Sequence, residues 1–232
     1  DEPKNLTPKK AKKDDHGFWI NAPVEAIAEA KRLKKPLMID FYGIWCPPCN
    51  MLNELVFPKT EFKKAAKQFV LLKMDADQEL SWALKSKFKV GGYPTLLFVK
   101  TESQDLQEID RVMGFLDLAP LVKRMNFISA HQQFNQSERL DFLKGKPEFL
   151  IELKRQIEVL MDQKEFDLAS EKIKSGLTTF PDDPDFKLDE ILIQIQLLDK
   201  KDDELKKFLF QTSTQTVIKT LRNRRKELSS SS

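Results

Sequence analysis

The feature that most constrains this chain is a pair of cysteines, Cys46 and Cys49, with Pro47 and Pro48 between them. They are the 2 cysteines of a 232-residue chain. Two thiols so close in sequence cannot hold distant segments together, so they indicate chemistry rather than structural cross-linking. The apolar run at residues 37–42 shortly before them is typical of a buried strand, and prolines suit the first turn of a helix. We therefore expect the cysteines where a strand turns into a helix.

A position at the start of a helix suits a reactive thiol. The first helical N–H groups point toward the Cys46 sulfur, and the helix dipole favours a negative charge there. The thiolate is the form that attacks a disulfide, and Cys49, one turn later, can attack the mixed disulfide from within. Half of a zinc site and two inert thiols are the alternatives. Zinc needs about four ligands, and the 2 histidines, His16 and His131, lie far from the pair in sequence, so we expect no metal.

The patterning around the pair predicts an α/β domain. Helices are expected at residues 23–34, 47–55, 59–67, 79–88 and 117–130, and strands at residues 37–42, 69–74, 95–100 and 108–113. The strands nearest the cysteines are continuous apolar runs, as in a central sheet that is buried on both faces. The order of elements therefore predicts a sheet covered by helices.

The character of the chain changes after residue 130, where no strand pattern remains. Helical stripes of apolar residues predict helices at residues 148–162, 166–177, 185–198, 202–211 and 214–228. We expect a small all-α domain of antiparallel hairpins, which resembles tetratricopeptide-type units loosely and without a clean repeat of about 34 residues. The polar, Lys-rich start is predicted to be a flexible arm. The expected organisation is an arm at 1–15, an α/β domain at 16–130 and a helical domain at 131–232.

The overall composition excludes several classes of protein. Hydrophobic residues make up 41% and charged residues 32% of the chain, which suits packed cores rather than general disorder. The formal net charge is only +3, so nothing favours nucleic acid as a partner. No apolar run approaches the roughly 20 residues that a membrane-spanning helix needs.

Two segments resemble the thioredoxin family. Residues 37–49, LMIDFYGIWCPPC, resemble its active-site segment, and residues 91–98, GGYPTLLF, resemble its cis-proline segment. Residues 25–77 are similar to the thioredoxin-like domain of the exported DsbD group, with matching stretches at residues 56–58 and 73–77. The resemblance covers about residues 16–128 and implies a thioredoxin fold for the α/β domain. It implies nothing about the helical domain.

The resemblance implies roles for the residues of the dithiol site. Cys46 would be the attacking nucleophile, which requires that it reaches solvent, and Cys49 would be the resolving thiol. Asp40 matches the buried acid beneath the resolving cysteine, where a raised pKa would let it take the Cys49 proton. Lys73 matches the lysine near that acid. An ordinary strand-end Asp40 and a solvated surface Lys73 are the alternatives.

The resemblance also implies a substrate-binding rim. Trp45 would pack beside the dithiol, and Pro94 would follow a cis peptide bond, with Tyr93 lending backbone groups to an extended substrate segment. Simple packing for Trp45 and an ordinary strand-start proline are the alternatives. Ile44 and Tyr93 make the mouth of the site more apolar than in many relatives. We therefore expect a protein partner with exposed hydrophobic side chains near its cysteine.

The implied activity is that of a thiol–disulfide oxidoreductase that reduces or isomerises disulfides of protein substrates without a cofactor. It implies a redox recycling partner, which a membrane protein could supply, while the oligomeric state is left open. The start at Asp1, without Met, adds to the expectation of a periplasmic or otherwise exported mature chain after signal removal, with a trimmed cytoplasmic chain as the alternative. The competing functions are a chaperone-like adaptor that binds partners through the helical domain, and a peroxide-reducing enzyme.

Overall fold

The computed structural model describes residues 11–102, 105–134 and 136–199. The helices expected at residues 202–211 and 214–228 lie outside the described residues, as does most of the expected arm. The chain divides into two compact units between Asp141 and Phe142. Each unit is considered by itself below.

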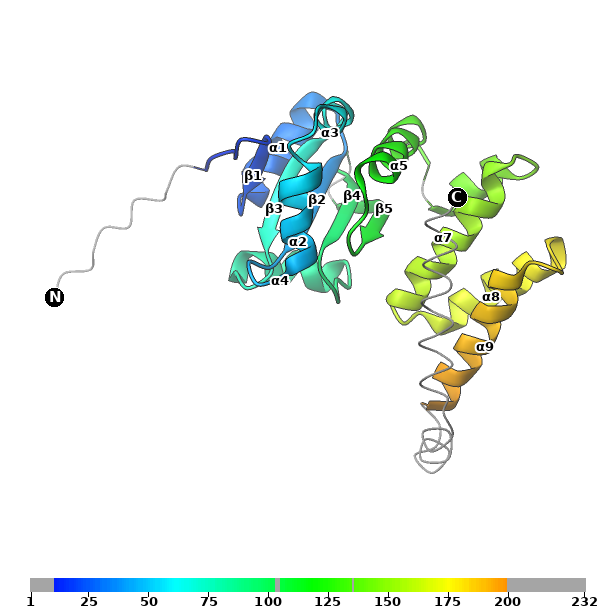
Figure 1. The fold of residues 1–232 in the computed structure, drawn as a ribbon. Coiled ribbons are helices and arrows are strands. Elements are labelled where there is room, and N and C mark those ends of the chain that lie inside the picture. Colours follow the sequence, from blue (N-terminus) through cyan, green and yellow to red (C-terminus); the bar gives the residue numbers. More distant parts are fainter. Residues whose placement is uncertain (1–10, 103–104, 135, 200–232) are drawn as a thin grey trace. The chain divides into compact units, whose positions relative to one another are not determined.

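The first unit is built on a mixed five-stranded sheet, as the α/β pattern predicted. Its strands, in spatial order, are β1 (Phe18–Ile20), β3 (Val70–Asp75), β2 (Leu37–Tyr42), β4 (Thr95–Lys100) and β5 (Gln107–Met113) (Figure 1). The strands β1, β3 and β2 run parallel, and β4 pairs antiparallel with both β2 and β5. The first strand, β1, was not predicted, because three residues carry too little alternation to be distinguished from a loop.

Helices cover both faces of this sheet. They are α1 (Pro23–Leu33), α2 (Pro47–Met51), the π-helical turn η1 (Leu52–Val56), α3 (Thr60–Ala66), α4 (Glu79–Lys87) and α5 (Leu118–Ala130). Alternate residues of each strand point to opposite faces, so Met38 and Leu71 pack with η1, α3 and α5, whereas Ile39 and Leu72 pack with α1 and α4. The same alternation places Asp40 and Lys73 on the face that η1, α3 and α5 cover.

The second unit is helical in its described part. Its helices are α7 (Glu148–Asp162), α8 (Phe166–Thr179) and α9 (Pro184–Asp199), while α6 (Gln136–Leu143), which was not predicted, spans the division between the units. Short connections fold α7 and α8, and α8 and α9, into antiparallel hairpins, with Leu153, Ile157 and Ile173 buried. The likeness to tetratricopeptide units stays a prediction. None of the described helices is long and apolar enough to cross a membrane.

Candidate functional site

The two cysteines form a disulfide at the first turn of α2. Their sulfur atoms are 2.11 Å apart. Cys46 is the N-cap of the helix, and the backbone N–H of Cys49 donates a hydrogen bond of 3.3 Å to the Cys46 sulfur. Pro47 and Pro48 occupy the first helical positions, where the missing N–H groups of proline cost little. The local sequence therefore places Cys46 at a helix N-terminus, where the Cys49 N–H can stabilise a thiolate.

The disulfide is nearly buried, and the residues just before it in the chain are exposed and apolar. Cys46 is 3% exposed and Cys49 is 2% exposed, whereas the neighbouring Ile44 and Trp45 are 72% and 59% exposed. Cys46 thus exposes very little of its surface to solvent, next to two exposed apolar side chains. Ile44, one of the two residues from which the sequence predicts an apolar mouth, is exposed, and the exposed Trp45 adds to the apolar area.

Two segments that are distant in sequence hold the Trp45 ring in place. Its indole Nε1 donates a hydrogen bond of 2.7 Å to Asp77 Oδ2, after β3. The Tyr93 ring, before β4, meets it edge-on with 5.8 Å between the ring centroids, and the Tyr93–Pro94 peptide bond is cis. Gly43 leaves room for the ring, since a Cβ there would lie 2.7 Å from it. Sequence reasoning assigned Asp77 no role, although it lies just after a buried strand and ends the stretch 73–77 that resembles the DsbD group.

Asp40 is a buried carboxyl on the sheet face that η1 covers. It is 2% exposed, and its Oδ1 atom has no hydrogen-bond partner. Burial raises the pKa of Asp40 from its ordinary value of 3.8 to about 7, against the attraction of Lys73, while the negative charge of Asp14 adds to the rise. Asp40 can therefore both hold and release a proton around neutral pH, as a group that exchanges protons with a thiol must.

Lys73 lies opposite Asp40 in the register of β2 and β3 and is only 6% exposed. Its ammonium group nevertheless donates a hydrogen bond to Asn53 Oδ1, and it lies 3.4 Å from Asp14 Oδ2. It also lies over the rings of Phe18, Phe57 and Tyr42. The solvated surface lysine that was the alternative for this position is thus not what the structure has. Sequence reasoning missed Asn53 and Asp14 entirely.

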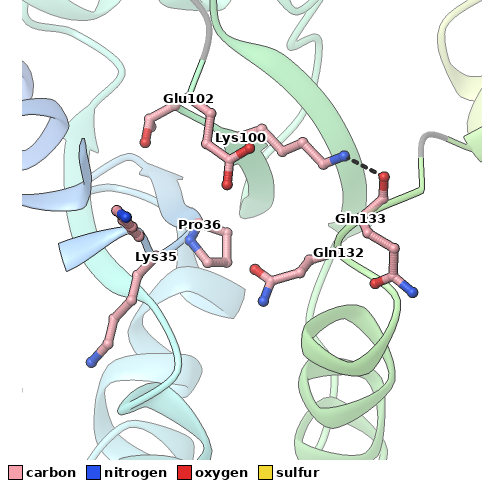
Figure 2. A pocket seen from close by; sticks show the side chains of 8 residues that line it. Lys35, Pro36, Lys100, Glu102, Gln132 and Gln133 are labelled. Carbon is pink, nitrogen blue, oxygen red and sulfur yellow. Dashed lines mark hydrogen bonds between the residues drawn. The ribbon is translucent and has the colours of Figure 1, made fainter. Parts of the chain in front are cut away.

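A separate polar pocket lies at the opposite end of the strands from the disulfide (Figure 2). It adjoins Pro36, just before β2, whereas the cysteines follow the other end of β2. Lys35 donates a hydrogen bond of 2.6 Å to the Lys67 carbonyl, and Lys100 donates one of 2.8 Å to the Gln133 carbonyl. This pocket therefore plays no part in the dithiol site. Across residues 11–102, 105–134 and 136–199, no three His, Cys, Asp or Glu side chains gather closely enough to hold a metal ion.

Comparison with known proteins matches the same part of the chain. Residues 19–101 match the model of a thioredoxin-like family. The thiol:disulfide interchange protein DsbD of Salmonella typhimurium is 37% identical over 97 residues, which are 41% of this chain and 17% of that protein. The protein of the same name from Vibrio vulnificus is 33% identical over 107 residues, 45% of this chain and 18% of the relative.

A solution structure of a thioredoxin from Thermus thermophilus aligns with 48% of this chain and 87% of its own, at 22% sequence identity and a TM-score of 0.45. The chain spans less than a fifth of the length of the curated relatives it matches. The resemblance read from residues 37–49 and 91–98 is confirmed by the family match and by these relatives.

Proposed function

Because residues 19–101 form a thioredoxin-like domain similar to part of the DsbD proteins, we propose that this chain exchanges disulfides with other proteins through Cys46 and Cys49. The observation that carries the proposal is the disulfide at the first turn of α2, next to exposed apolar residues. A redox pair has to form and break such a bond, and its first sulfur has to be stabilised as a thiolate.

The exchange takes two steps that together move two electrons. In the first, the Cys46 thiolate of the reduced chain attacks one sulfur of a substrate disulfide. A bond forms between Cys46 and the substrate, and the other substrate sulfur leaves as a thiolate. In the second, Cys49 loses its proton and attacks the Cys46 sulfur, so that the second substrate thiolate leaves. The substrate ends reduced, and this chain ends with the Cys46–Cys49 disulfide present in the structure.

We assign the proton transfer in the second step to Asp40. Asp40 shares a sheet face with η1, which directly continues the helix that carries Cys49. With a pKa of about 7, a large share of molecules holds the carboxylate form at neutral pH, and that form can accept the Cys49 proton. Lys73, which favours the charged form of Asp40, is the supporting residue in this assignment.

The rim around the disulfide is the surface we assign to substrate binding. Ile44 and Trp45 expose apolar area beside Cys46, and the contact between Trp45 and Tyr93 extends this area toward Pro94. A substrate segment with hydrophobic residues beside its cysteine would bury these side chains. Each large apolar side chain fully buried contributes about 1.5–3 kcal/mol. In this proposal, the backbone groups of Tyr93 hold that segment in extended form.

We propose that the chain reduces protein disulfides, with net electron flow toward the substrate, or isomerises them, in which case no net electrons are transferred. The support is the similarity to proteins named for thiol:disulfide interchange. A reductant has to return two electrons to the Cys46–Cys49 bond after each turnover, so the proposal includes a redox recycling partner, which we place at a membrane. We place the chain itself in the periplasm or a similar exported compartment, where disulfides persist.

The test of this proposal is insulin reduction by the full chain with dithiothreitol, beside Cys46→Ser and Cys49→Ser variants. We expect activity in the wild type and none in Cys46→Ser. When the reduced Cys49→Ser chain is mixed with insulin after the dithiothreitol has been removed, we expect a trapped mixed disulfide, because that variant cannot complete the second step. Equilibration with glutathione then measures the potential that sets direction. A wild-type chain inactive with every reductant would refute the proposal and favour the adaptor function.

The assignment of Cys46 as the nucleophile has its own test. After reduction, iodoacetamide should label Cys46 well before Cys49, since only the Cys46 sulfur lies at the helix N-terminus. Mass spectrometry of the labelled peptides identifies the site. Equal labelling of the two cysteines would contradict the assignment of Cys46 as the nucleophile.

A further inference from the structure

A tight turn before β1 fixes the position of one carboxylate, that of Asp14. The chain reverses between Lys12 and Ile20, with the backbone N–H of Asp14 donating to the Phe18 carbonyl and that of Ile20 donating to the Lys12 carbonyl. The Oδ1 atom of Asp14 accepts hydrogen bonds of 2.9 Å from the backbone N–H groups of His16 and Phe18. The Asp14 side chain is therefore held by the turn itself, and its second oxygen, Oδ2, faces Lys73.

The Lys73 ammonium is bound from two sides by groups other than Asp40. Asp14 Oδ2 lies 3.4 Å from Lys73 Nζ, and Asn53 Oδ1 accepts its hydrogen bond. Asn53 belongs to η1, a π-helical turn, which is a form often found at functional sites. Although Asp40 and Lys73 are register partners, no ion pair links them in the described part of the chain. The Oδ1 atom of Asp40 is left without a hydrogen-bond partner.

We propose that Asp14 is a positioning residue for the dithiol: it holds the Lys73 ammonium off Asp40 and thereby keeps Asp40 available to take up the Cys49 proton. The inference rests on the proposed function, because it deepens the role assigned to Asp40. Asp14 lies outside residues 19–101, the part of the chain that matches the family. The pKa of Asp40 would thus depend on a segment that precedes the matched domain.

The charges around Asp40 support this reading. Apolar side chains such as Leu52, Val56 and Leu96 pack on this face of the sheet, and the charged groups that act on Asp40 are Lys73 from β3 and Asp14 from the turn. Tyr42, on β2 itself, interacts with Asp40 and Asp14, and also with Asp75 at the end of β3. Asp14 raises the pKa of Asp40 in two ways. Its own negative charge repels the Asp40 carboxylate, and its contact with Lys73 draws away the cation that would otherwise stabilise that carboxylate.

The decisive experiment is Asp14→Asn, followed through the titration of Asp40. Asparagine keeps the Oδ1 acceptor for the N–H groups of His16 and Phe18, so the turn is preserved while the charge is lost. Carbon-detected NMR of the oxidised chain, without substrate, gives the pKa of the Asp40 carboxyl directly. We expect it to fall from about 7 in the wild type by about one pH unit or more, as a carboxyl does when a nearby cation is freed to approach it.

Asp15→Asn is the matched control, because Asp15 is the next residue, is exposed, and carries the same charge. We expect its effect on Asp40 to be at most a few tenths of a pH unit, since charges in solvent are screened. An Asp40 pKa that is unchanged by Asp14→Asn, or that falls equally with Asp15→Asn, would overturn the proposal.

A double-mutant cycle with Lys73→Met tests whether Asp14 acts through Lys73. In the Lys73→Met chain, Asp14→Asn should lower the pKa of Asp40 by clearly less than in the wild type, and an equal fall in both backgrounds would refute the route through Lys73. In the insulin assay, the rise of rate with pH should move to lower pH with Asp14→Asn. The Asp40 titration needs no substrate, so the two proposals can be refuted separately. An Asp40 pKa that does not respond to Asp14→Asn refutes the role of Asp14 even if the chain reduces insulin, and a chain that does not reduce insulin refutes the exchange function even if the Asp40 pKa responds.

Discussion

The burial of Asp40 makes the stability of the first unit depend on pH in a direction opposite to that of an ordinary ion-paired carboxylate. The informative change is Asp40→Asn, which replaces the carboxyl by an amide of nearly the same shape that does not titrate. Between pH 3.8 and about 7 the folded chain keeps a proton on Asp40 that the unfolded chain has lost. The folded state is therefore destabilised as the pH rises through this window, and the full penalty is present above it.

The size of the penalty follows from the rise in the pKa of Asp40. A rise from 3.8 to about 7 is worth about 4 kcal/mol at about 1.4 kcal/mol for each pH unit. Since Asp40 is only 2% exposed, solvent screening does not reduce this figure. The linkage relation places about 2.5 kcal/mol of the loss between pH 5 and pH 8. Relative to the wild type, Asp40→Asn should therefore gain about 2.5 kcal/mol of stability over that range.

Urea unfolding of the oxidised full chains, followed by tryptophan fluorescence, measures this difference. All 3 tryptophans, Trp19, Trp45 and Trp82, lie in the first unit, so the signal reports that unit alone. Comparing the two chains at each pH cancels the titration of every other group, and the change of this difference from pH 5 to pH 8 also cancels the constant cost of burying an amide. Asp15→Asn, on the exposed neighbour of Asp14, serves as the control. Its free energy of unfolding should change with pH as that of the wild type does, both at pH 5 and at pH 8.

The reasoning would be refuted by a stability difference between wild type and Asp40→Asn that stays constant from pH 5 to pH 8. Such a result would mean that Asp40 is already ionised at pH 5 in the folded chain. It would also remove the basis for assigning proton transfer from Cys49 to this carboxyl.

Three further changes test the packing around the site and beyond it. Gly43→Ala puts a Cβ 2.7 Å from the Trp45 ring; the ring must move, and we expect kcat/KM for insulin reduction to fall about threefold to tenfold. Asp110→Ala removes a fully buried carboxylate that is paired with both Arg124 and Arg139, which should lower the free energy of unfolding by about 3–5 kcal/mol in the urea assay. Gly176→Ala puts a Cβ 2.8 Å from the Phe186 ring. We expect the resulting overpacking, which costs about 1–3 kcal/mol, to outweigh the stabilisation of about 1 kcal/mol that alanine usually gives in a helix. Calorimetry of the full chain should therefore show a lower transition temperature.

Local patterning predicted the elements that carry the dithiol. The strand at residues 37–42 agrees with β2 (Leu37–Tyr42), and the prolines at 47 and 48 begin α2 as expected. The reason is that apolar runs and prolines act on the backbone within a few residues of themselves, so their effect can be read without the rest of the fold. The helix expected to continue to residue 55 ends instead at Met51 and passes into η1. That change could not be read from the sequence, because no residue type marks a π-helical turn.

The sequence by itself determined the sheet with its covering helices, the helical unit that follows, and the place of Cys46 at a helix N-terminus. Only the tertiary structure decided the surroundings of the buried acid: that Lys73 turns to Asp14 and Asn53 rather than to Asp40, and that Trp45 rests on Asp77 and Tyr93. The physical reason is one of range. Strands and helices follow from neighbours in the chain, whereas the partner of a buried charge is chosen among groups that are distant in sequence and that meet only when the sheet has formed.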